Sequence, residues 1–167
     1  VGNKIGKGNL IGARYSSFYS LKFGCFLAFF NMMILLTASE FLVSIINQDP
    51  NVIEIAVLLL VFAAFFQVAD ALVIGAQGSL RGYKVTISPM LIMLISFWVL
   101  AMPFGYSLAV TDFWNIQLGA PGMWTGMCVG LFVCASLMVW RMNFITAKAI
   151  ELQKEGLTFN QMSLDPT

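Results

Sequence analysis

Residues 63–81, AAFFQVADALVIGAQGSLR, place one carboxylate, Asp70, in the middle of an apolar stretch long enough to cross a lipid bilayer. A helix needs roughly 20 residues to span the hydrocarbon core, and insertion scales put a central carboxylate at a cost of about 2.5 to 3.5 kcal/mol. Intramembrane acids are functional residues by default. We therefore interpret Asp70 as the first candidate functional residue of the chain.

Asp70 belongs to a polar stripe on one face of the predicted helix. At about 100° per residue, four polar side chains project into one narrow sector, which is expected to face protein or a cavity while the opposite side faces lipid. The four residues are Gln67, Asp70, Gln77 and Arg81. A structural alternative stays open, in which Gln67 or Arg81 bonds to a purely structural Asp70, the amides join helices and Arg81 anchors the interface.

The composition is that of a polytopic membrane protein. Hydrophobic residues make up 59% of the 167 residues and charged residues 10%, and the mean hydropathy is +0.86. A soluble domain of this length does not have these values. Cys25, Cys128 and Cys134 lie in apolar segments of a chain without histidine, so we interpret them as packing residues and expect no cofactor. Nothing in the sequence indicates nucleic-acid binding.

Four apolar segments are long enough to span a bilayer, which predicts an all-α integral membrane fold. They cover residues 18–46, 52–80, 87–110 and 118–140. We predict a membrane domain over residues 1–147 and a polar cytoplasmic tail over 148–167, with a short helix near residues 147–155. Asn31, the strongly polar residue inside the first span, is expected to bond to a neighbouring helix.

Basic residues alternate with acidic ones along the connectors. Lys and Arg gather at the start of the first span, between the second and third, and after the fourth, whereas the other two connectors hold Asp49, Glu54 and Asp112 and no basic residue. Under the positive-inside rule, both termini and the middle loop are cytoplasmic.

Two further patterns concern helix geometry. Pro103 lies inside the third span, where a proline removes a backbone hydrogen bond and predicts a bend. In the fourth span Gly122, Gly126 and Gly130 recur every four residues, which predicts a ridge of small residues that another helix approaches closely.

The chain opens on valine without a recognisable leader, and residues 1–10 resemble the glycine-rich end of a preceding element.

Several local motifs, in this order, resemble the second half of a transporter of the multidrug and toxic compound extrusion (MATE) family, NorM-like branch. The resemblance covers residues 1 to about 145 and implies a fold of twelve helices in two lobes, of which this chain supplies the last four; the upstream helices would be its partners. The motifs are VGNKIGKGN at 1–9, NQDPNVI at 47–53, FQVAD at 66–70, GSLRGYK at 78–84, PFGY at 103–106 and LGAPGMWTG at 118–126.

The resemblance implies a role for particular residues. It assigns Asp70 to a cation site, as a metal ligand only if the coupling ion is Na⁺. Phe66 stands where the family commonly has tyrosine, which removes a hydroxyl ligand. The candidate cavity-lining residues are Phe66, Gln67, Gln77 and Tyr106.

The implied function is that of an inner (plasma) membrane antiporter, not an enzyme, that exports amphipathic, often cationic drugs in exchange for Na⁺ or H⁺. The carboxylate in a low-dielectric cavity must be neutralised by a proton, a metal ion or a cationic substrate, and exchange follows if it holds one at a time. Lipid-linked flippase activity, another exporter of this fold, and a non-transporting membrane subunit are the alternatives. Membrane lipid and small amphipathic compounds are the expected partners.

Overall fold

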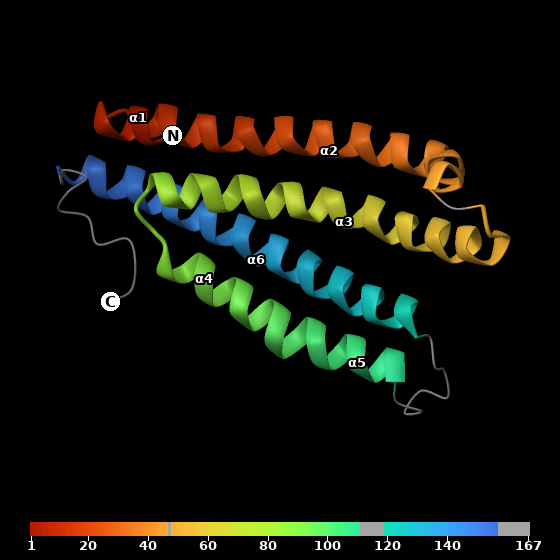
Figure 1. Ribbon diagram of the computed structural model, residues 1–167. Helices are drawn as coiled ribbons and strands as arrows, with labels where there is room; N and C mark the ends of the chain where they lie inside the picture. Colours follow the sequence, from red (N-terminus) through yellow and green to blue (C-terminus); the bar gives the residue numbers. More distant parts are fainter. Residues whose placement is uncertain (47, 111–118, 157–167) are drawn as a thin grey trace.

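The computed structural model describes residues 1–46, 48–110 and 119–156, and for Asn51 the backbone alone. Throughout these ranges the secondary structure is helical, without strands (Figure 1). The elements are α1 (Gly2–Gly6), α2 (Leu10–Ile46), α3 (Pro50–Gly82), α4 (Ile87–Leu94), the π-helix η1 (Ile95–Ala101), α5 (Met102–Val110) and α6 (Ala120–Lys154).

The predicted all-α membrane fold is confirmed. Within the described ranges, four helical segments are long and apolar enough to cross a membrane. They are Leu10–Ile46, Val52–Gly82, Ile87–Val110 and Ala120–Lys154. The third agrees with the predicted span at both ends.

The first and fourth helices extend beyond the spans predicted from hydropathy. α2 begins at Leu10 rather than residue 18, and α6 runs to Lys154 as one helix, so the separate short helix expected near residues 147–155 is its last turns. Their polar turns stay helical because they pack: Leu10, Ala13 and Ile145 belong to one buried cluster. Most of the proposed tail, residues 157–167, lies outside the described residues.

The helices lie side by side in the order α2, α3, α6 and then α4 to α5, although the chain visits them in a different order (Figure 1). α3 packs between α2 and α6, and α6 carries η1 and α5 on its other side. The start of α2, the turn between α3 and α4, and the end of α6 share one end of the bundle, which we call the basic end. The positive-inside rule assigns this end to the cytoplasm.

The core of the bundle lies toward the basic end. It joins the first turns of α2, the second half of α3 and the second half of α6. The largest fully buried side chains include Leu10, Leu80, Tyr83, Leu131, Met138, Met142 and Ile145. Asp70 lies on α3 near the middle of this helix, at the edge of the core.

The predicted glycine ridge on α6 is confirmed. A β-carbon on Gly122 would lie 2.8 Å from the backbone carbonyl of Leu108, and one on Gly126 would collide with the backbone of Gly105. Glycine at these positions therefore allows α5 to approach α6 backbone to backbone. The bend expected at Pro103 stays a prediction. The π-helix η1 ends two residues before Pro103 and includes Val99, whose carbonyl a proline at 103 cannot bond.

Candidate functional site

Asp70 lines an open groove of about 420 Å³ between α2 and α3. Small residues line the groove on both helices and leave open space between them. From α2 it is lined by Ser20, Gly24, Leu27, Ala28 and Asn31, and from α3 by Gln67, Asp70, Ala71, Ile74 and Gly75. The two helices come close where a β-carbon on Gly75 would lie 2.9 Å from Cδ2 of Leu21.

Three polar side chains of the groove lie near the middle of the two spans. Asn31 comes from α2 and is exposed, whereas Gln67 and Asp70 come from α3 and are half-buried. The Oε1 atom of Gln67 is buried and has no hydrogen-bond partner. Within the described part of the chain, no hydrogen bond joins any two of these three side chains.

The two partners expected for a structural Asp70 do not reach its carboxylate in the described residues. Among the residues that are described, neither Gln67 nor Arg81 bonds to the Asp70 carboxylate. Arg81 is exposed at the end of α3, eleven residues and therefore about 16 Å further along the helix axis. Among the described residues, the Asp70 carboxylate therefore has no hydrogen-bond or ion-pair partner.

The chemistry of the groove suits a hard cation or a proton. One carboxylate and two amide groups offer oxygen ligands, which alkali and alkaline-earth ions prefer over nitrogen and sulfur. The described residues contain no cluster of three or more His, Cys, Asp or Glu side chains. A transition-metal centre would need such a cluster, so the groove offers a single charge surrounded by neutral dipoles.

The other candidate residues lie away from the groove. Nε2 of Gln77 donates a hydrogen bond to Sδ of Met93, at 3.4 Å, so its side chain faces α4. The rings of Phe66 and Trp124 of α6 form a T-shaped pair, with centroids 6.4 Å apart and planes at 76°. Tyr106 is exposed on α5. The structure therefore brings together Gln67 and Asp70 of the predicted set and separates Phe66, Gln77 and Tyr106 from them.

Asn31 is the groove residue that the sequence analysis assigned differently. We expected its amide to bond to a neighbouring helix, and the described residues include no such bond; it faces the groove instead. The signal was present in the sequence, because Asn31 is the strongly polar residue inside an otherwise apolar span. What the sequence lacked was the pairing of α2 with α3, which turns Asn31 toward Asp70.

Four apolar helices, and a groove between α2 and α3 whose carboxylate has no partner among the described residues, define a multi-pass membrane protein with a polar site inside its membrane region. A family model described as MatE matches residues 1–107. The chain therefore belongs to the MatE family, whose members are transporters rather than enzymes, and is a multi-pass protein of the inner (plasma) membrane.

A curated relative gives the scale of the whole protein. The chain is 36% identical over 145 residues to "Multidrug resistance protein MdtK" of Pectobacterium atrosepticum, an alignment that covers 87% of this chain. It spans 32% of the length of that relative.

Proposed function

We propose that the complete protein to which these four helices belong exports amphipathic, often cationic compounds in exchange for Na⁺ or H⁺, and that Asp70 holds the coupling cation. The observation that carries this proposal is the Asp70 carboxylate in the open groove between α2 and α3, which has no partner in the part of the chain that the structure describes. Family membership and the relative's name, a multidrug resistance protein, support it.

The mechanism follows from the electrostatics of the groove. A carboxylate surrounded by low-dielectric protein and lipid needs a positive partner, and one acid accommodates one such partner at a time. Binding of a cationic substrate therefore displaces the proton or Na⁺, and the inward movement of the coupling ion sets the outward gradient of the substrate. An inside-negative potential of 100 mV contributes about 2.3 kcal/mol per elementary charge moved across.

Asn31 and Gln67 supply the neutral part of the proposed site. Both residues line the same groove as Asp70, and their amides offer oxygen ligands for Na⁺ or for a protonated carboxyl once Gln67 turns its buried Oε1 toward the groove. The upstream helices of the same protein would complete the cavity.

The experiment is export of a cationic dye from cells that lack their own efflux pumps, using the full-length protein. Asp70→Asn keeps the size of the side chain and removes its charge, and we expect it to insert normally and to lose export. Glu40→Gln is the matched control, because Glu40 is exposed on α2 outside the groove. Replacement of Na⁺ by choline at fixed pH then identifies the coupling ion.

The same experiment separates the alternatives. Normal export by the Asp70→Asn protein would remove Asp70 from the mechanism. Absence of dye export by the wild-type protein, with correct insertion, would favour a lipid-linked flippase or a non-transporting subunit over a drug antiporter.

A further inference from the structure

A second pocket lies at the basic end of the bundle, between α2 and α6, well away from Asp70. Its volume is about 340 Å³, and it is lined by one charged, two aromatic and two aliphatic side chains. These are Ile11, Arg14, Tyr15, Phe18 and Ile150. The proposed transport mechanism makes no use of this pocket.

Arg14 is held in position by neutral groups, and no carboxylate of the described residues pairs with it. Nη2 of Arg14 donates a hydrogen bond to Oδ1 of Asn143 on α6, at 3.0 Å, and the guanidinium carbon lies 5.7 Å from the centroid of the Phe18 ring. Both partners are neutral. The charge of Arg14 lowers the pKa of the Tyr83 phenol, but burial has the larger effect and raises this pKa to about 12. The phenol is therefore neutral at physiological pH.

The pocket lies at the level of a membrane interface. Tyr15 and Tyr19 of α2 are 73% and 77% exposed, and Trp140 of α6 is 65% exposed and stacks on Phe144. Tyrosine and tryptophan gather where hydrocarbon meets headgroups. Asn143, the partner of Arg14, lies about one turn beyond Trp140, which places the guanidinium on the headgroup side of this aromatic belt.

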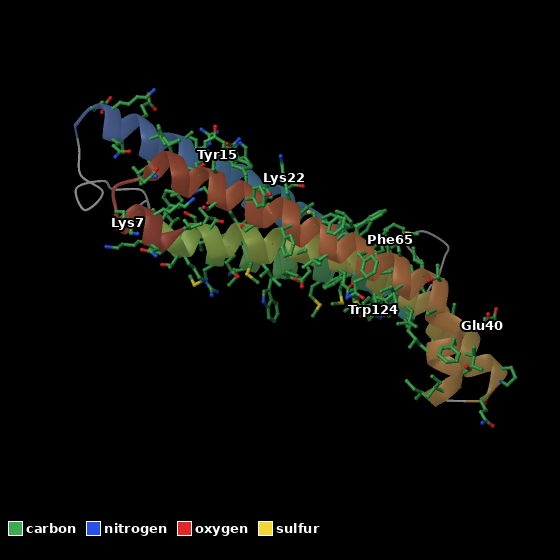
Figure 2. All side chains as sticks on the ribbon, turned by 90° about the horizontal axis from the view of Figure 1, so that it is seen from above. Lys7, Tyr15, Lys22, Glu40, Phe65 and Trp124 are labelled. Carbon is green, nitrogen blue, oxygen red and sulfur yellow. The ribbon has the colours of Figure 1, made fainter. Side chains whose placement is uncertain are left out.

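An exposed aromatic face of α2 runs from the pocket toward the membrane centre. At 100° per residue, its side chains fall within one sector next to the pocket, and all are exposed. They are Tyr15, Tyr19, Phe23, Phe26 and Phe30. Lys22 lies on the same side of α2 as Tyr15 and adds a second positive charge (Figure 2).

We propose that this pocket binds the phosphate headgroup of an anionic phospholipid in the cytoplasmic leaflet. The planar guanidinium of Arg14 has further N–H donors beyond the one bonded to Asn143, and its fork matches two phosphate oxygens. The acyl chains of the lipid lie along the exposed aromatic face of α2. Charge complementarity selects an anionic lipid over a zwitterionic one, because the site offers positive charge and no carboxylate among its lining residues.

The test measures lipid retention by the purified full-length protein. The protein is delipidated and exposed to vesicles of phosphatidylglycerol or of phosphatidylcholine. Native mass spectrometry then measures how much lipid stays bound to it. We expect the wild type to retain phosphatidylglycerol preferentially, and Arg14→Gln to retain it at least about fivefold less, the worth of one basic group at an anionic surface. Arg81→Gln is the matched control, an exposed arginine at the same end that does not line the pocket.

Two further variants keep the test valid if Arg14→Gln fails to fold. Ile11→Glu places a carboxylate in the pocket from a residue that is 57% exposed, and we expect it to remove the preference for phosphatidylglycerol while the protein stays folded. Asn143→Ala removes the hydrogen bond to Arg14 but keeps its charge, and should still retain the lipid.

Three outcomes overturn the proposal. In the first, the Ile11→Glu protein retains as much phosphatidylglycerol as the wild type. In the second, Arg81→Gln loses as much phosphatidylglycerol as Arg14→Gln does. In the third, inorganic phosphate stabilises the protein against thermal unfolding as much as phosphatidylglycerol does, which would assign the pocket to a free anion. None of these measurements depends on transport activity.

Discussion

Gly126 of α6 lies against the backbone of Gly105 of α5, and a β-carbon on Gly126 would overlap that backbone. We expect Gly126→Ala to force the two helices apart and to lower the free energy of unfolding by about 1–3 kcal/mol, the usual cost of overpacking. Thermal unfolding of the purified protein in detergent measures the change. The effect is specific to the contact, because alanine is intrinsically the better helix former.

Gly78→Ala is the control for this prediction. A β-carbon on Gly78 would meet nothing within 4 Å, although the residue lies inside a long helix as Gly126 does. Alanine there should be neutral or stabilise by up to about 1 kcal/mol. Equal destabilisation by both substitutions would show that the ridge is not a packing contact.

Gln67 and Gln77 form a matched pair that tests which amide belongs to the site. Gln67→Leu removes a buried oxygen that has no hydrogen-bond partner, so we expect no loss of stability. It should raise the coupling-ion concentration needed for half-maximal export by about two- to tenfold, the worth of one polar contact. Gln77→Leu removes a bond to Met93 outside the groove and should leave that concentration unchanged.

Dye export at graded Na⁺ or H⁺ concentrations measures this difference. A larger effect of Gln77→Leu than of Gln67→Leu would mean that the cation site extends toward α4 rather than α2.

How far the sequence predicts this structure depends on whether the signal is local. The four spans, the glycine ridge and the position of Asp70 follow from apolar length, residue spacing and the cost of a buried charge. The ends of α2 and α6 do not, because their polar turns stay helical by packing on each other.

The lining of the groove was only partly predictable for the same reason. The rotation of 100° per residue places Gln77 within 20° of Asp70 around the helix axis. It does not reveal where α4 lies, and the Gln77 amide donates its hydrogen bond to Met93 of α4. Phe66 likewise packs on Trp124 because α6 lies on that side of α3. Asn31 joins the groove from another helix, and periodicity within one helix does not reveal such a neighbour.

Tyr83 gives a prediction about pH. It lies in the turn between α3 and α4, outside the membrane-spanning segments, and burial raises its pKa to about 12 although the charge of Arg14 opposes the shift. An unfolded chain has a tyrosine pKa of about 10. The neutral phenol therefore stabilises the fold below about pH 10, and this contribution is lost as the pH rises toward 12.

Spectroscopic titration of the phenolate absorbance checks this prediction by difference between the wild type and Tyr83→Phe. The Tyr83 component should titrate above the ordinary range of tyrosine. Titration of Tyr83 near pH 10 would contradict the burial of this phenol.

In the proposed mechanism, the Asp70 carboxylate exchanges one positive partner for another. The most direct measurement uses the purified full-length protein in sealed liposomes, with a Na⁺ or H⁺ gradient imposed and the uptake of a cationic dye followed by fluorescence. We predict gradient-driven accumulation by the wild type and by Glu40→Gln, and none by Asp70→Asn at equal protein incorporation. Accumulation by Asp70→Asn at the wild-type rate would contradict the account.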